Sequence, residues 1–127
     1  MYPQGCRYTK DHEWIAVEGD RGRIGVTDYA QKQLGDVVFV DLPRVGSSLD
    51  QFATFGVVES VKAVSSLYSP VDGEVIAVNT DLPGRLETLG SDPYGEGWMI
   101  KVALTGDGGA GKLMDFAAYQ KQCAAEG

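Results

Sequence analysis

The sequence has few of the residues that build metal, redox or histidine-based catalytic sites. It contains two cysteines, Cys6 and Cys123, near opposite ends of 127 residues, and one histidine, His12. Two distant thiols lack the paired spacing of a zinc site or a redox dithiol, and they are too few for a disulfide framework. A catalytic triad or a zinc site would have to use His12, and the sequence signals neither. We therefore expect a reducing compartment and a locally hydrogen-bonded His12.

Basic residues are also scarce. The chain has 11 Lys and Arg against 18 Asp and Glu, which gives a formal net charge of −7. This balance argues against binding to a nucleic-acid backbone, which requires clustered cations. The acidity favours either an acidic docking face for larger enzymes or simple solubility.

Long hydrophobic runs are absent, and the first residues resemble neither a signal peptide nor an amphipathic presequence. We expect a cytoplasmic protein, or a mitochondrial matrix protein whose presequence has been removed.

The chain is long enough for a single domain, residues 1–127, and most of it has the pattern of short strands separated by glycine. This pattern predicts a mainly β fold, either a sandwich or a small barrel. The expected strands are 14–18, 23–27, 37–42, 54–59, 74–78 and 98–104.

Two helices are expected beside these strands. Thr27 can cap a short helix over 28–34 that Gly35 ends, and the apolar spacing over 112–124 predicts a C-terminal helix. The connection 79–97 has the composition of a surface loop with a short helical turn. All of these are expected to be structural elements.

Three glycines, Gly106, Gly108 and Gly111, have the spacing of a dinucleotide-binding loop between a strand and a helix. A nucleotide fold needs that helix to return to a parallel strand, and here the sequence ends directly after it. We interpret the glycines as a flexible connector.

The segment 56–64 is more informative, because a single lysine, Lys62, interrupts an apolar strand that then resumes. A strand, a turn and a returning strand would place Lys62 at a hairpin tip. Such a lysine is ordinarily a solvated charge. Its small neighbours Val61 and Ala63 would also leave it accessible to an enzyme that attaches a prosthetic group. Glu59 could then be a residue that this enzyme recognises, or it could simply be a carboxylate at the end of a strand. A nucleophilic lysine of lowered pKa is a third reading, which would require burial or nearby cations.

The residues around Lys62 are similar to a known family. The segment Glu59-Ser60-Val61-Lys62-Ala63 resembles the lipoylation site of glycine cleavage H proteins, and differs from the sites of 2-oxoacid dehydrogenase lipoyl domains and biotin carriers. The resemblance covers nearly the whole chain, apart from residues 1–7, taken as an N-terminal extension, and the Gly-rich stretch near Gly108. Further matching segments are 8–14, 27–31, 34–38, 69–75 and 92–98.

The resemblance implies a barrel-sandwich hybrid of antiparallel sheets, related to lipoyl and biotinyl domains, with a short internal helix and a C-terminal helix. It implies lipoate in amide linkage to Lys62 and a monomeric carrier with no catalytic activity of its own. The implied partners are a lipoate-attaching enzyme and three others: pyridoxal-phosphate glycine decarboxylase, aminomethyltransferase and dihydrolipoamide dehydrogenase. The carrier would take an aminomethyl group from the first of these to the second, and its reduced arm to the third.

A cleft that shelters the loaded arm is also implied. By position, Glu13 would face the amine of the cargo, with Val26, Ala30 and Ala63 as apolar lining. Asp11 falls near this cleft.

The chain departs from the family pattern at three positions. Ser66 stands where many relatives have Asp, Gln33 where a familiar relative has His, and Gly90 where Asn is usual. An alternative within the same resemblance is an H-like lipoate donor that relays lipoyl groups to other enzymes.

Overall fold

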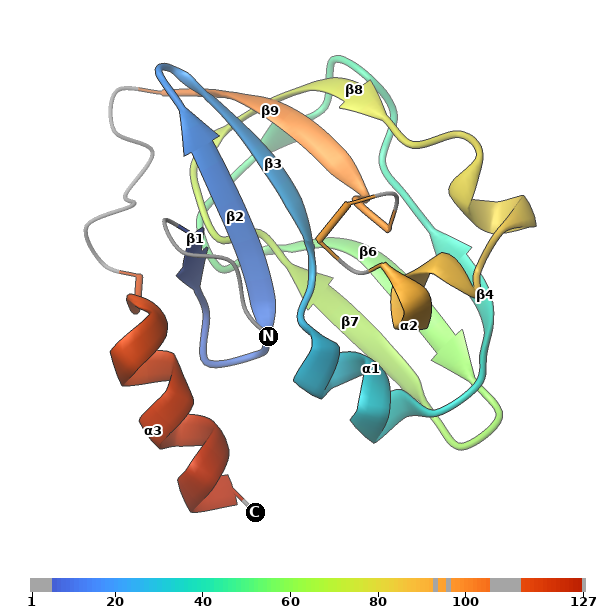
Figure 1. Cartoon of the computed structure of the whole chain (residues 1–127). Coiled ribbons are helices and arrows are strands. Elements are labelled where there is room, and N and C mark those ends of the chain that lie inside the picture. Colours follow the sequence, from blue (N-terminus) through green and yellow to red (C-terminus); the bar gives the residue numbers. More distant parts are fainter. Residues whose placement is uncertain (1–5, 93, 96, 106–112, 127) are drawn as a thin grey trace.

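The computed structural model describes residues 6–92, 94–95, 97–105 and 113–126, and its fold is mainly β (Figure 1). These residues form nine strands, three α-helices and one 3-10 turn. The strands are β1 (Cys6–Tyr8), β2 (Glu13–Glu18), β3 (Arg21–Val26), β4 (Val37–Asp41), β5 (Ser48–Leu49), β6 (Thr54–Ser60), β7 (Val64–Tyr68), β8 (Gly73–Val78) and β9 (Ile100–Leu104). The helical elements are α1 (Asp28–Leu34), η1 (Leu82–Gly84), α2 (Thr88–Ser91) and α3 (Phe116–Glu126).

Two antiparallel sheets form the body of the fold. One has six strands in the order β1-β2-β3-β9-β8-β5, and the other has three in the order β4-β6-β7. Their inner faces share one core, in which Ile24 of the larger sheet and Val58 and Leu67 of the smaller sheet are almost fully buried. The expected sandwich-type hybrid of antiparallel sheets is confirmed, and neither sheet closes into a barrel.

Helix α1 follows its sequence signals closely. The Thr27 hydroxyl accepts a hydrogen bond from the Ala30 amide at 3.2 Å, which satisfies one of the free N–H groups of the first turn. Gly35 ends the helix with φ 75°, a conformation that glycine adopts without strain. The helix is thereby fixed between β3 and β4.

A second, aromatic cluster covers the outer face of the six-stranded sheet. Tyr8, Trp14 and Tyr119 are fully buried in it, and Tyr119 stacks on Tyr8 with ring centroids 4.6 Å apart. This stacking holds α3 next to β1, and the two elements are drawn side by side in Figure 1. Both cysteines, Cys6 and Cys123, are free thiols.

Several element bounds differ from the sequence expectations. Strand β1 begins at Cys6, inside the expected N-terminal extension, because it pairs with β2. Helix α3 begins at Phe116 rather than 112, and the short strands β1 and β5 were not predicted. Residues Gly106, Gly108 and Gly111 lie outside the described part of the chain. No helix among the described residues is long and apolar enough to cross a membrane.

Candidate functional site: a hairpin lysine and a buried carboxyl group

Lys62 lies at the tip of the β6–β7 hairpin, as the sequence predicts. The turn is built around Ser60, whose hydroxyl accepts hydrogen bonds from the amides of Lys62 and Ala63, each at 3.2 Å. The Ser60 amide also donates to the Ala63 carbonyl at 2.8 Å, and the Val61 amide donates to the Asp36 carbonyl at 3.1 Å. The tip is therefore held both internally and against the segment that follows α1.

The Lys62 side chain is exposed and extends past the end of α1. Its Cε would lie 3.5 Å from a Cβ placed on Gly35, an ordinary contact distance, so the lysine stem lies next to the residue that ends the helix. Lys62 forms no ion pair with any residue that the structure describes. Its neighbours Val61 and Val64 are 69% and 62% exposed, which is unusual for valine. An approaching enzyme would thus meet an accessible amine surrounded by small apolar side chains.

Glu59 lies one strand position before this turn. In the sheet register it stands between Phe39 of β4 and Val64 of β7, so the three side chains share the outer face. Phe39 is 50% exposed. Glu59 consequently presents a carboxylate within an exposed apolar surface beside Lys62.

Glu13, at the start of β2, is the only buried acidic side chain among the described residues, with 2% of its surface exposed. The Thr9 hydroxyl donates to its Oε1 at 2.5 Å, and the Tyr68 amide lies 3.4 Å from its Oε2. Burial raises the pKa of Glu13 to about 8, against the lowering effect of these hydrogen bonds, and the nearby Asp11 charge raises it further. At neutral pH this carboxyl group is mostly protonated.

The edge of β7 connects Lys62 with Glu13. Strand β7 is an outer strand of its sheet, and within the described part of the chain only β6 pairs with it. The Tyr68 amide points away from β6 toward Glu13, so the backbone groups of Val64 and Ser66 face the same free edge. Five residues of strand span about 13 Å. A chain of backbone donors and acceptors thus runs from the lysine turn to the carboxyl group.

The other residues expected in the cleft come from β3, α1 and the β6–β7 turn. Val26 pairs directly with Glu13 and is 3% exposed, and Ala30 lies in the first turn of α1, partly buried against the core. Ala63 is exposed beside Lys62. The structure therefore brings Glu13 and Val26 together, while Ala63 stands at the lysine end.

A cavity of about 590 Å³ adjoins the buried carboxyl group. Thr9 and Tyr68, the two hydrogen-bond partners of Glu13, line it together with Asp11. Phe52 and Met114 contribute apolar lining. Asp11, which the resemblance placed near the cleft, is thus located at this cavity.

His12 takes part in a hydrogen bond, as the sequence predicts, but the partner of its ring is distant in the chain rather than local. Its Nδ1 lies 2.8 Å from the Tyr119 hydroxyl, which is also 2.6 Å from the Thr27 hydroxyl. The sequence did not reveal the importance of Tyr119 or of Thr9. The spacing of Thr9 four residues before Glu13 is the only local signal for the second, and Tyr119 is too distant in the chain to give any.

The two antiparallel sheets define the class of this protein as one with a lipoyl-type fold, and the β6–β7 hairpin presents an accessible lysine. Comparison with known proteins gives the family: residues 6–126 match the family model described as glycine cleavage H-protein. The chain belongs to the glycine cleavage H-protein family.

The individual relatives agree with this assignment. A glycine cleavage system H protein of Symbiobacterium thermophilum is 54% identical over 117 residues, covering 92% of this chain and 91% of the relative. One from Rubrobacter xylanophilus is 57% identical over 103 residues, covering 81% and 82%. The crystal structure of a glycine cleavage system H protein from Mycobacterium marinum has a TM-score of 0.90 at 38% identity, covering 97% of this chain and 99% of the other.

Proposed function

We propose that this chain is a cytoplasmic, non-catalytic carrier that holds lipoate in amide linkage to Lys62. It would take an aminomethyl group from glycine decarboxylase to aminomethyltransferase, and then present its reduced arm to dihydrolipoamide dehydrogenase. Lipoate, when bound, would supply the disulfide and dithiol chemistry of this cycle. The observation that carries the proposal is an exposed, unpaired lysine amine on a braced hairpin in a chain of this family.

The surroundings of Lys62 suit covalent attachment at its amine. A rigid turn fixes where the arm begins, and the absence of a described carboxylate partner leaves the amine free for acylation. The end of the lysine stem lies next to Gly35, at the end of α1. A nucleophilic lysine would need burial or nearby cations, and the described residues around Lys62 provide neither.

The residues between Lys62 and Glu13 would shelter the cargo. The free edge of β7 offers backbone hydrogen bonds along the route, and Val26, Ala30 and Ala63 would give apolar contacts that exclude water. At the far end, Glu13 would accept a charge-assisted hydrogen bond from the amine of the cargo. A cation beside Glu13 favours its ionised form, so binding of the amine would release the proton that this carboxyl holds at neutral pH.

The surface around the hairpin would receive the enzymes that act on the arm. Val61 and Val64 flank Lys62, and Phe39 extends the apolar surface onto β4. Such exposed apolar side chains mark contact sites for other proteins. Glu59, within this surface, would be recognised by the lipoate-attaching enzyme.

Intact-mass measurement after co-expression with a lipoylation system tests the attachment. The chain should gain the mass of one lipoyl group, Lys62→Arg should gain none, and Lys10→Arg, an exposed control, should be modified like the parent. Circular dichroism should show all three folded, because a hairpin-tip side chain buries little apolar surface. Lipoylation of Lys62→Arg would refute the assignment. Glu59→Gln should slow attachment while leaving the thermal unfolding curve in place.

Reconstitution tests the carrier role itself. The lipoylated chain, mixed with the three partner enzymes, should support glycine-dependent release of carbon dioxide. An inactive mixture, despite partners that work with another H protein, would instead favour the relay of lipoyl groups to other lipoate-dependent enzymes.

A further inference from the structure

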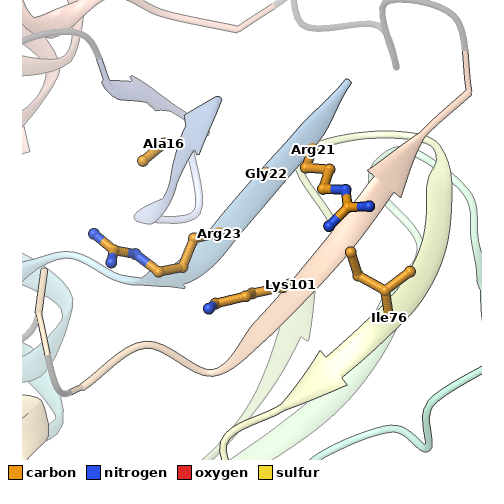
Figure 2. A pocket seen from close by; sticks show the side chains of 6 residues that line it. All are labelled: Ala16, Arg21, Gly22, Arg23, Ile76 and Lys101. Carbon is orange, nitrogen blue, oxygen red and sulfur yellow. The ribbon is translucent and has the colours of Figure 1, made fainter. Parts of the chain in front are cut away.

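A pocket lined by cations lies on the outer face of the six-stranded sheet, away from the lysine hairpin. It has a volume of about 300 Å³, and Figure 2 shows its lining side chains. The lining residues are Ala16, Arg21, Gly22, Arg23, Ile76 and Lys101. Three of the chain's 11 basic residues thus share one concave surface in a protein of net charge −7.

The sheet register brings these cations together. Arg23 of β3 pairs directly with Lys101 of β9, and Arg21 stands two residues before Arg23 on the same face. In Figure 2 the Lys101 side chain extends in the direction of Arg23, and the Arg21 side chain reaches across β9 toward Ile76. Like charges directly opposite each other on neighbouring strands destabilise a sheet. A bound anion would remove that repulsion.

Aromatic groups hold two of the cations in place. The Arg23 guanidinium lies 5.6 Å from the ring centroid of Trp14, and its Nη2 donates to the Tyr94 carbonyl at 3.0 Å. The Lys101 ammonium lies 5.0 Å from the ring centroid of Trp98. Cation–π contacts of this kind restrict side chains that would otherwise move freely in water. These two positive charges are therefore positioned before any ligand binds.

The three cationic side chains have donors without a protein partner in the part of the chain that the structure describes. The Nε of Arg23 is buried and has no hydrogen-bond partner, which is uncommon for a buried polar atom. Among the described residues, no carboxylate forms an ion pair with Arg21 or Lys101. Arginine presents a planar fork of donors that suits the oxygens of a phosphate group, and a lysine adds a point charge.

From these observations we infer that the pocket binds a compact phosphate group, either as inorganic phosphate or as the phosphate of a small monoester. Arg23 is the fixed donor, and Arg21 and Lys101 add charge from either side. The volume accommodates such a ligand but not a large cofactor. The site is separate from Lys62, so binding requires neither lipoate nor a partner enzyme.

Tryptophan fluorescence of the intact chain reports on this pocket directly, because its two tryptophans, Trp14 and Trp98, are the rings beneath Arg23 and Lys101. Inorganic phosphate and glycerol phosphate are titrated in separate arms at constant ionic strength, with sodium chloride as the reference salt. Each arm should give a saturable change that chloride does not produce. A tighter response to glycerol phosphate would identify a monoester as the ligand, and equal responses would identify the free ion.

Substitutions then locate the binding. Arg21→Gln and Lys101→Gln, both at exposed positions, should each weaken phosphate binding about tenfold, the loss expected for one charge-assisted contact. Arg44→Gln is the control, because it makes the same change in net charge in the exposed loop after β4. It should bind phosphate as the parent does. The inference is overturned if neither phosphate produces a saturable response. It is equally overturned if all three variants bind alike.

Discussion

Because the pKa of Glu13 is raised, we expect the stability of this protein to fall as the pH rises. Its pKa rises from 4.5 to about 8 on folding, chiefly because burial disfavours the ionised carboxylate. Between these values the folded chain keeps a proton that the unfolded chain has released. The proton that Glu13 keeps therefore stabilises the folded chain fully below the pKa that Glu13 has in the unfolded chain. This stabilisation is lost as the pH rises through the pKa that Glu13 has in the folded chain.

The size of the effect follows from the shift. Each unit of pKa difference corresponds to about 1.4 kcal/mol. Raising the pH from about 5 to about 8 should therefore lower the contribution of Glu13 to the free energy of unfolding by on the order of 4 kcal/mol. This loss is a large part of the stability of a small domain.

Glu13→Gln isolates this contribution, because an amide of nearly the same shape stays neutral at every pH. It still offers an oxygen to the Thr9 hydroxyl, although its NH₂ group cannot accept from the Tyr68 amide. Urea unfolding of both proteins, followed by circular dichroism from about pH 5 to 8, gives the two curves. The parent should lose stability relative to Glu13→Gln by about 1.4 kcal/mol per pH unit. Glu87→Gln, which removes an exposed carboxylate, should keep the steep parent profile.

Parallel profiles for the parent and Glu13→Gln would refute the reasoning, since they would mean that Glu13 is ionised in the folded chain over this whole range. A parent that becomes more stable than Glu13→Gln with rising pH would refute it more strongly. That result would require the hydrogen bonds to Glu13 to lower its pKa by more than burial raises it.

Two further substitutions test how the outer face is held. Tyr119→Phe removes a hydroxyl that lies within hydrogen-bond distance of both Thr27 and His12. It should lower the free energy of unfolding by about 1–3 kcal/mol in urea titrations. An unchanged midpoint would show that these hydrogen bonds add nothing to the stability of the fold. Gly25→Ala should lower the free energy of unfolding by about 1–3 kcal/mol in the same assay, because the new Cβ would lie 2.9 Å from the Trp14 ring. Gly84→Ala is the control. Its Cβ would meet no atom within 4 Å, so it should change the free energy of unfolding far less. Equal losses for the two glycine variants would contradict this account.

The sequence predicted those features whose causes lie within a few residues. The cap at Thr27 and the left-handed Gly35 define α1 locally, and Lys62 could be placed at a hairpin tip because apolar segments flank it on both sides. The resemblance of the same segment to a known family added the sheet architecture. Strand β1 escaped prediction because three residues give no alternating pattern, and only pairing with β2 makes them a strand.

The features that were missed depend on contacts between distant segments. Tyr119 meets Thr27 across 92 positions, and the Tyr68 amide meets Glu13 across 55. The pairing of Arg23 with Lys101 likewise depends on the register of two strands far apart in the chain. No local pattern specifies these contacts, because each is set by how the sheets pack together.

This division follows from what each residue does. Lys62, the proposed attachment point, must be reachable. It stands on a short turn whose hydrogen bonds come from Ser60 and its neighbours, and a local sequence is enough to specify such a turn. A carboxyl group that is to meet a cationic cargo must instead be withdrawn from water, and only the assembled fold can do that. In Glu13, the residue proposed to meet the amine, this withdrawal has a measurable cost, since burial also raises its pKa to about 8. A cation that binds there recovers this cost, so the empty carrier should be the less stable form at alkaline pH and the loaded carrier the more stable one.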